Sequence, residues 1–234
     1  MISTEGDYTD WSHIDYQPVI HELLPDGLVP FLSPGQSALE IGSGRGAVCF
    51  FLARHGLHAL GIDINHDAIA VARQQALRDG LGLTLRFEVA DILKQTDIGA
   101  FDFVLMIRVL TCFSEIASWQ ALLRRAYECI KPGGMIYVHD FLLAPLNENY
   151  LWRYERGREL GWRNGNFAVN DTRGRLLFIA HHHPKEEVEE VVAPYQVVSL
   201  QSHESLSMNG NACSMFEFLG IKRALTMVPI GQDF

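Results

Sequence analysis

The sequence predicts an α/β fold in which a doubly wound, mostly parallel sheet ends in an antiparallel C-terminal strand pair. Three observations support this fold class. Short apolar runs alternate five times with segments of helical spacing between residues 37 and 141. The last run, residues 135–141, is almost continuously apolar, which is typical of a strand buried on both faces of a parallel sheet. Two strand-like runs, residues 196–204 and 213–222, then close the chain.

The first unit is a strand, a turn, a helix and a second strand. Residues 37–41 form a short apolar run that ends in glycines, and residues 47–55 follow with helical spacing. Residues 58–64 predict the second strand. Asp67 then predicts the cap of a helix that runs through Asp79 and ends at a glycine.

The same rhythm continues to Phe141. Residues 84–89 and 101–107 predict the third and fourth strands, and a helix over 115–130 stops at the sequence Lys-Pro-Gly-Gly of residues 131–134. Ligands of doubly wound sheets bind beyond the carboxyl ends of the strands. We therefore expect the functional site at that edge of the sheet.

After Phe141 the alternation breaks. A short helix over 184–193 precedes the closing strand pair, and residues 142–180 form an insertion that is rich in aromatic and arginine residues. These are Trp152, Tyr154, Trp162, Phe167, Arg153, Arg156, Arg158, Arg163, Arg173 and Arg175.

Composition limits the classes of partner. With 234 residues, one compact domain is the expectation. The net charge of −9 repels polyphosphates, so we expect no nucleic-acid partner. The first residues are polar and acidic, and no apolar run approaches the roughly 20 residues that span a bilayer. Four widely spaced cysteines without a C-x-x-C pair fit reduced thiols. We expect a cytoplasmic protein with no membrane partner.

A glycine-rich turn, Glu40-Ile41-Gly42-Ser43-Gly44-Arg45-Gly46, lies between the first strand and the first helix. Glycines permit positive φ and let a ligand approach the backbone closely. A bare tight turn is the simpler interpretation, and the spacing also fits the fingerprint of dinucleotide-binding turns. Asp63 ends the second strand 17 residues after Gly46, where its carboxylate can accept hydrogen bonds from a ribose. A nicotinamide enzyme would use an acid there too.

Three further features separate the alternatives: Glu40 before the glycines, Asp91 after the third strand, and residues 131–134 before the fifth. With them, the chain from about residue 36 to residue 223 resembles the class I S-adenosylmethionine-dependent methyltransferases. Their first motif, acid-x-Gly-x-Gly-x-Gly, is matched by Glu40 to Gly46. The resemblance implies that S-adenosylmethionine is the co-substrate.

The resemblance also implies which residues bind this co-substrate. The motif-one residues would cradle its methionine end, Asp63 would bind the ribose hydroxyls, and Asp91 would accept from the adenine amino group. Apolar residues that follow the second and third strands would contact the adenine, and the end of the fourth strand would lie beside the methionine moiety. The implied set is Glu40, Gly42, Ser43, Gly44, Gly46, Asp63, Ile64, Asp91, Ile92, Ile107 and Arg108.

A small-molecule acceptor follows from the same resemblance. The family's Asn/Asp-Pro-Pro-Tyr/Phe motif is missing after the fourth strand, where Ile107-Arg108-Val109-Leu110 stands, which argues against methylation of nucleic-acid amino groups or protein glutamine. We expect a single methyltransferase-like domain divided into an N-terminal lid (1–35), a cofactor-binding half (36–141), a substrate-covering insertion (142–194) and a closing strand pair (195–223). Tyr8, Trp11, His13 and Tyr16 would form that lid or pack an N-terminal helix.

The catalytic candidates are Asp140, Tyr154 and Arg153. Asp140 and His139 end the fifth strand, and we favour Asp140 as the group that orients the acceptor or takes its proton. Tyr150, Arg153 and Tyr154 share one helix face, where rings can surround a sulfonium and arginine can bind a carboxylate. Structural roles remain the alternative for each of them.

His181-His182-His183 suggests a metal, but neighbouring side chains on a strand point to opposite faces, so three consecutive histidines cannot bind one ion. We expect no metal and a strand end with His181 or His183 facing the sheet, although one histidine that reaches the pocket is an alternative. The acidic run Glu186, Glu187, Glu189, Glu190 predicts the exposed side of a helix.

Three functional alternatives stay open. The chain can catalyse attack on the aminocarboxypropyl arm of S-adenosylmethionine, by cyclisation or transfer, with release of methylthioadenosine. It can also be a non-catalytic S-adenosylmethionine-binding protein, or a nicotinamide enzyme. The motifs all concern cofactor binding, so methyl transfer and attack on the aminocarboxypropyl arm share them, whereas Glu40, Asp91 and residues 131–134 disfavour the nicotinamide enzyme.

Overall fold

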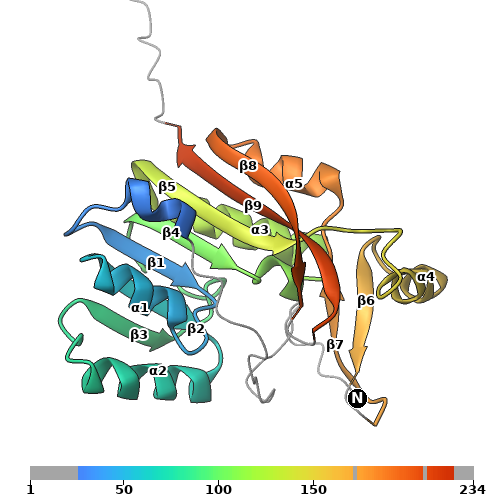
Figure 1. Ribbon diagram of the computed structural model, residues 1–234, viewed down its shortest axis with the longest axis horizontal. Coiled ribbons are helices and arrows are strands. Elements are labelled where there is room, and N and C mark those ends of the chain that lie inside the picture. The colour runs from blue at the N-terminus through green and yellow to red at the C-terminus, as the bar shows by residue number, and fades with distance from the viewer. Residues whose placement is uncertain (1–25, 171–172, 208–209, 224–234) are drawn as a thin grey trace, which may run out of the picture.

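The computed structural model describes residues 26–170, 173–207 and 210–223. Its seven-stranded sheet has the order β3-β2-β1-β4-β5-β9-β8 (Figure 1). Strands β1 to β5 are parallel, β9 is antiparallel to β5, and β8 is antiparallel to β9. The predicted fold class is therefore confirmed. The bounds are β1 (Ser37–Ile41), β2 (His58–Asp63), β3 (Leu85–Val89), β4 (Phe101–Ile107), β5 (Ile130–Phe141), β8 (Tyr195–Leu206) and β9 (Ala212–Lys222).

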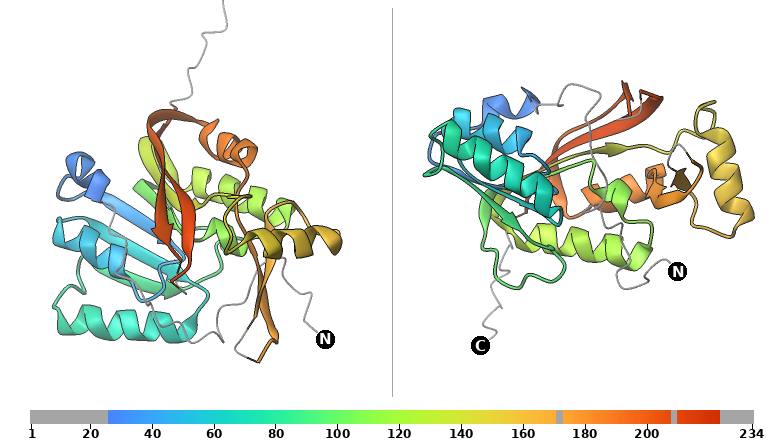
Figure 2. Two further views of the ribbon diagram at one scale, coloured as in Figure 1. Left: turned by 45° about the vertical axis from the view of Figure 1, so that its right-hand side comes forward. Right: turned by 90° about the horizontal axis from the view of Figure 1, so that it is seen from below.

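Helices cover both faces of the sheet (Figure 2). The helices α1 (Ala47–Arg54) and α2 (His66–Arg78) pack on one face, in a core cluster that also holds Leu28 of the short helix η2 (Asp26–Phe31). On the other face, α3 (Ile116–Glu128) and α5 (Lys185–Val192) share a second cluster. Each helix contributes an apolar stripe, which is why the strands between them are apolar on both sides.

Most element boundaries differ from the predicted ones by a residue or two, and two differences have a clear physical cause. Asn65, not Asp67, caps α2, because its side-chain oxygen accepts from the Ala68 N–H at 2.9 Å. Residue 130 belongs to β5 and not to α3. Strand β5 includes the Lys-Pro-Gly-Gly stretch, where Gly133 has φ of +74° and the pairing with β4 shifts register. The glycines of residues 131–134 thus mark an irregularity within β5, although the sequence pattern suggested the end of a helix.

The insertion contains a hairpin that the sequence analysis did not predict. After α4 (Leu151–Glu159), β6 (Asn166–Asn170) and β7 (Leu176–His181) form a separate two-stranded antiparallel sheet. Figure 1 shows α4 and this hairpin at the side of the molecule toward which β1 and β4 point. A third apolar cluster joins them to Phe141 and Met215 at the adjoining ends of β5 and β9. The insertion therefore stands next to the expected site.

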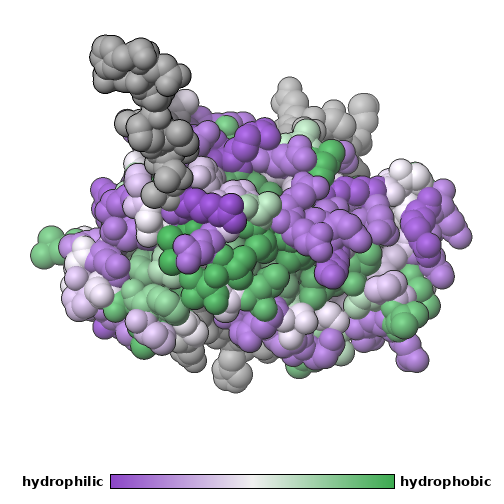
Figure 3. All heavy atoms as spheres, turned by 90° about the horizontal axis from the view of Figure 1, so that it is seen from above, coloured by the Kyte–Doolittle hydropathy of each residue, from purple (hydrophilic) through white to green (hydrophobic). Residues whose placement is uncertain are grey.

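Some apolar side chains remain exposed. They include Val29 and Phe31 of η2 and Val197, Val198 and Leu200 of β8, the edge strand of the sheet. Figure 3 shows apolar atoms gathered in the middle of the face seen from above. Within the described ranges, no helix is long and apolar enough to cross a membrane.

Candidate active site

The glycine turn lies at the point where the strand order reverses, between β1 and β4. Its three glycines have positive φ: +74° at Gly42, +51° at Gly44 and +86° at Gly46. A Cβ atom on Gly42 would lie 2.4 Å from Val109, and one on Gly46 would lie 2.3 Å from the Phe87 ring. A Cβ on Gly44 would meet nothing within 4 Å. The turn is thus packed at both ends and open in its middle.

Asp63 lies directly beside this opening. Its carboxylate accepts from the Gly44 N–H and from the Asn65 N–H, each at 2.7 Å. Burial raises the pKa of Asp63, and these hydrogen bonds oppose that rise. Because each carboxylate oxygen has two lone pairs, Asp63 can still accept from further hydroxyl groups.

The side chains of Glu40 and Ser43, both residues of the turn, are buried. Glu40 is 5% exposed and accepts from the Cys49 N–H at 3.1 Å and from its thiol at 3.0 Å. This contact joins the end of β1 to the first turn of α1, where a negative charge is favourable. The Ser43 hydroxyl is buried and has no hydrogen-bond partner among the described residues.

The predicted adenine-side residues have mixed surroundings. Asp91 accepts from the Leu93 N–H at 3.0 Å and lies 3.2 Å from the Lys94 ammonium. Ile64 is partly buried. Ile92, by contrast, is 5% exposed and packs in the core cluster of the α3 face.

Arg108 follows β4 in a strained conformation. Among the described residues it is the one non-glycine with positive φ, at +56°, a cost that backbones bear mainly at functional sites. Its N–H donates to the His139 carbonyl at 2.8 Å, which fixes it against β5. The guanidinium lies 5.7 Å from the centre of the Phe141 ring, and the preceding Ile107 is partly buried against the α1-side cluster.

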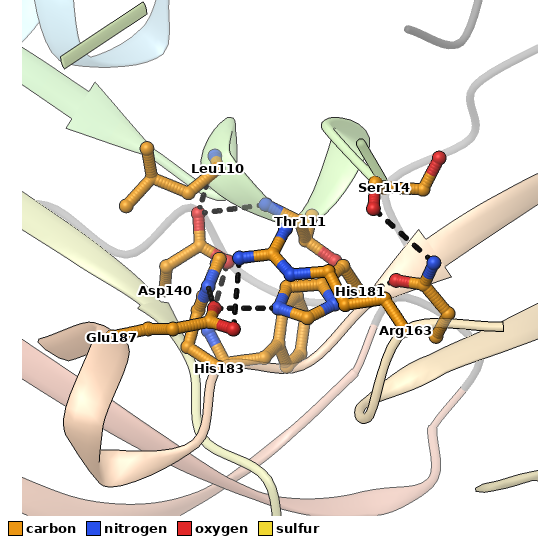
Figure 4. Close-up of polar contacts among 10 residues, drawn as sticks. Leu110, Thr111, Ser114, Asp140, Arg163, His181, His183 and Glu187 are labelled. Atoms are coloured by element: carbon orange, nitrogen blue, oxygen red, sulfur yellow. Dashed lines mark hydrogen bonds and ion pairs between the residues drawn. The ribbon is translucent and has the colours of Figure 1, made fainter. Parts of the chain in front are cut away.

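Asp140 is fully buried at the end of β5 (Figure 4). Its carboxylate accepts from the backbone N–H groups of Leu110 at 2.8 Å, Thr111 at 3.4 Å and Phe141 at 2.8 Å. Burial raises its pKa to about 7, although these donors and Arg108 favour the charged form. Asp140 thereby anchors the short helix η3 (Leu110–Cys112), which follows β4.

Alternation along β5 decides which side chains face the same side as Asp140. Ile136 and Val138 pack in the cluster of α3, so Asp140 lies on that face. Tyr137 packs in the cluster of α1, so His139 lies on the opposite face. The rings of His139 and His203 stack there with centroids 5.2 Å apart and Nε2 atoms 3.2 Å apart. Sequence reasoning considered His139 but preferred Asp140, and it did not single out His203.

Tyr154 and Arg153 belong to the aromatic cluster of the insertion. The Tyr154 hydroxyl lies 2.6 Å from Nδ1 of His182, and burial raises the pKa of Tyr154 above its ordinary value. The Arg153 guanidinium lies 5.1 Å from the Trp152 ring centre and 6.0 Å from that of Phe167. Its Nε is buried without a hydrogen-bond partner among the described residues. The hydrogen-bond partners of Asp140 are backbone groups of η3 and β5, whereas Tyr154 contacts His182, so these two candidates are held by different parts of the site.

His181 ends β7, and His183 points to the same side of the chain as His181, whereas His182 points to the other side. His181 Nε2 lies 2.7 Å and His183 Nδ1 3.1 Å from one Glu187 oxygen (Figure 4). The Arg163 guanidinium lies 2.8 Å from the other oxygen. Burial tends to raise the pKa of Glu187, but the hydrogen bonds to the two histidines hold it at about 2.

This arrangement corrects one expectation and qualifies another. Glu187 was predicted on an exposed helix side, yet only 12% of its side chain is exposed. His181 and His183, without His182, lie with Glu187 so that one ligand atom from each falls within 4.8 Å of the others, a grouping that the sequence did not predict. Arg163 on the same carboxylate opposes a cation there, since like charges repel in a buried site. The predicted N-terminal aromatic residues Tyr8, Trp11, His13 and Tyr16 lie outside the described residues.

Known proteins resemble about half of the chain in sequence. A family model described as "Methyltransferase domain" matches residues 39–136. Phosphoethanolamine N-methyltransferase 1 of Arabidopsis thaliana is 32% identical over 116 residues, 49% of this chain and 23% of that protein. The ubiquinone biosynthesis O-methyltransferase of Methylococcus capsulatus is 31% identical over 126 residues, 51% of this chain and 52% of the relative. The matched parts are thus about a quarter and about half of these relatives.

Solved structures resemble most of the chain. The structure of a SAM-dependent methyltransferase from Methanosarcina mazei has a TM-score of 0.80 at 25% identity, and the match covers 86% of this chain and 99% of that one. An N-methyltransferase from Bradyrhizobium japonicum in complex with S-adenosyl-L-homocysteine has a TM-score of 0.55 at 18% identity, covering 81% and 79%. The second likeness shows a shared fold.

Proposed function

Because the chain belongs to the class I S-adenosylmethionine-dependent methyltransferase family, we propose that it transfers a methyl group from S-adenosylmethionine to a small molecule. The observation that carries this proposal is the opening at Gly44. The glycine turn exposes its backbone there, at the reversal of the strand order, with the Asp63 carboxylate 2.7 Å from the Gly44 nitrogen. A turn backbone that a ligand can approach closely, beside a carboxylate with lone pairs left to accept hydroxyl hydrogens, suits a ligand that carries a ribose.

The residues present fit this co-substrate. Gly42, Ser43, Gly44 and Gly46 would hold its methionine end, with Glu40 fixing the turn. Asp63 would accept from the ribose hydroxyls, and Ile64 and Asp91 would contact the adenine. Ile92 packs in the core and would support Asp91 through the backbone. Ile107 and Arg108 would lie beside the methionine moiety. The buried Ser43 hydroxyl without a partner among the described residues further supports a ligand at the turn.

The chemistry requires little from the protein beyond positioning. When bound, S-adenosylmethionine supplies a methyl carbon that is activated by a sulfonium. The chain must hold an acceptor atom in line with that carbon and exclude water. We propose that Asp140 is a positioning residue that fixes η3 beside the site, because three backbone N–H groups donate to its carboxylate. Tyr154, through its contact with His182, is a positioning residue of the insertion.

Several observations favour a small acceptor. The net charge of −9 disfavours nucleic acid. The insertion places aromatic rings and Arg153 next to the end of β5, a lining that suits a planar or carboxylate-bearing molecule. The curated relatives named above act, by their names, on phosphoethanolamine and in ubiquinone biosynthesis.

Mass spectrometry of the products tests this function. The protein is incubated with S-adenosylmethionine and a small-metabolite extract, and we expect S-adenosylhomocysteine together with a product heavier by one methylene. At an S-adenosylmethionine concentration well below the parent Kd, Asp63→Ala should lower both signals about tenfold or more, whereas the matched control Asp67→Ala, a change in an exposed acid of α2, should not.

Two other outcomes contradict methyl transfer. Methylthioadenosine would mean attack on the aminocarboxypropyl arm. Unchanged S-adenosylmethionine, with binding intact, would mean a non-catalytic binding protein.

A further inference from the structure

We propose that Arg108, His139 and His203 form a subsite for an oxyanion, and that the acceptor therefore carries a carboxylate or a phosphate group. The identity of this anion as part of an acceptor rests on the proposed function. The subsite itself rests on contacts in the structure. It lies where β4 and β5 end, on the α1 side of the sheet.

The first step is position. His139 pairs with Ile107 in the sheet register, and Arg108 donates its backbone N–H to the His139 carbonyl. His139 lies on the face opposite to Asp140, as the alternation of β5 requires. His203 reaches the same place from β8 across β9. Strands β5 and β8 thus bring the two rings together, and Arg108, which follows β4, is fixed to the same end of β5 through its backbone, where the reacting end of the co-substrate is proposed.

The second step is the uncompensated charge of Arg108. Among the described residues, its guanidinium donates to one acceptor, the Leu206 carbonyl at 3.3 Å, and it also lies over the Phe141 ring. Its Nε is buried without an acceptor in the same part of the chain. Asp140 is near enough to sense this charge, but backbone amides already occupy its oxygens. A buried unsatisfied donor costs about 1–3 kcal/mol, and an oxyanion would satisfy it.

The third step is the histidine pair. With Nε2 atoms 3.2 Å apart, one ring must donate and the other must accept. When His203 donates, the remaining proton of neutral His139 lies on Nδ1, a buried atom with no partner among the described residues. Burial, and then the charge of Arg108, lowers the pKa of His139 to about 4, so the ring is neutral at pH 7. An anion would stabilise the tautomer that presents Nδ1–H.

Together these features describe the ligand. A guanidinium nitrogen and an imidazole N–H are donors that suit the oxygens of a carboxylate or a phosphate. The Phe141 ring beside Arg108 adds an apolar surface for the rest of the molecule. The strained backbone of Arg108 is then explained, because it keeps the guanidinium at this position.

Histidine ring-nitrogen NMR tests the subsite without relying on turnover. Protein labelled with ¹⁵N-histidine is titrated with sodium acetate and, separately, with inorganic phosphate at constant ionic strength, with and without S-adenosylhomocysteine. His139→Gln and His203→Gln assign the two rings. We expect saturable shifts of both rings, with little change at the exposed His66. Shifts that saturate with only one of the two anions identify whether the subsite binds a carboxylate or a phosphate.

Arg108→Gln should weaken anion binding at least tenfold, and the matched control Arg86→Gln, an exposed arginine of β3, should leave it unchanged. Equal anion affinity in Arg108→Gln and the parent protein would overturn the subsite, as would shifts that never saturate. His203→Gln, which alters a partly exposed side chain, provides a second variant and should weaken binding too. If the anion binds but S-adenosylhomocysteine does not, the subsite stands and the proposed function fails.

Discussion

Gly44 and Gly46 stand two residues apart in one turn, yet they are glycines for different physical reasons. A methyl group on Gly46 would lie 2.3 Å from a carbon of the buried Phe87 ring, whereas one on Gly44 would enter open space. We therefore expect Gly46→Ala to lose about 1–3 kcal/mol of unfolding free energy from overpacking, in addition to the left-handed backbone cost.

Gly44→Ala should lose only about 1 kcal/mol for its φ of +51°. Its new methyl group should still lower the affinity for S-adenosylhomocysteine at least tenfold, because it fills the proposed ligand position. Urea unfolding and calorimetry measure the two effects separately. Unchanged affinity in Gly44→Ala would remove the opening at this glycine from the binding site.

The burial of Asp140 predicts how the unfolding free energy depends on pH. Burial raises its pKa in the folded protein to about 7, from an ordinary value of 3.8. The folded state therefore holds this proton more tightly than the unfolded chain does. The stabilising contribution is complete below pH 3.8 and is lost as the pH rises through 7.

Asp140→Asn removes this titration. The unfolding free energy of the variant minus that of the parent should therefore rise by about 4 kcal/mol between about pH 4 and pH 8. Taking the difference cancels the titration of His139 and His183, whose pKa values near 4 act in the opposite direction. Denaturant titrations of both proteins across this pH range measure the difference in unfolding free energy. A difference that does not vary with pH would mean that the pKa of Asp140 is not raised in the folded protein.

At the scale of elements, one carboxylate links α5 to the inserted hairpin. Glu187 of α5 receives His181 and His183 from the end of β7, and Arg163 from the segment before β6. Glu187→Gln leaves these buried groups without their anion, which should cost about 3 kcal/mol of unfolding free energy. The matched control is Glu186→Gln, since the neighbouring Glu186 is exposed; it should change stability by less than about 0.5 kcal/mol. Equal losses in both variants would show that Glu187 is not the link.

The elements that could be predicted from the sequence are those with a strong local period. Strand β4 was predicted over 101–107 and has those bounds, because it is a single apolar run between polar loops. The hairpin β6–β7 was missed, since β6 has only five residues and its pairing partner lies beyond a polar turn. The sequence predicts which residues of β7 share a face. It does not predict that α5 places Glu187 beside His181 and His183. Such contacts come from tertiary packing, which has no local period.

For the candidate site, local sequence motifs predicted the glycine turn, Asp63 and the end of β4. The sequence did not indicate on which face of β5 each side chain lies. Asp140 and His139 are adjacent in sequence, and only the packing of Ile136, Val138 and Tyr137 against α3 or α1 separates them. His203 is 64 residues from His139 and reaches it through the strand pair β8–β9.

At the scale of the whole molecule, the sheet order decides where all these parts meet. The chain crosses from β3 back to β4 beside β1, so the glycine turn, Asp63 and Arg108 lie along one edge. Strand β9 then inserts antiparallel between β5 and β8, and this brings His203 and the insertion to the same end. One edge of the sheet therefore serves both the proposed co-substrate and the proposed acceptor.

The central claim is that this edge binds an adenosyl amino acid and not a dinucleotide. Isothermal titration calorimetry with S-adenosylhomocysteine and with NAD tests it most directly. We predict one site with a Kd on the order of 1 µM or lower for S-adenosylhomocysteine, no heat from NAD, and a loss of about 1.5–3 kcal/mol in Asp63→Ala through the ribose hydrogen bonds. Tight binding of NAD without binding of S-adenosylhomocysteine would contradict the account.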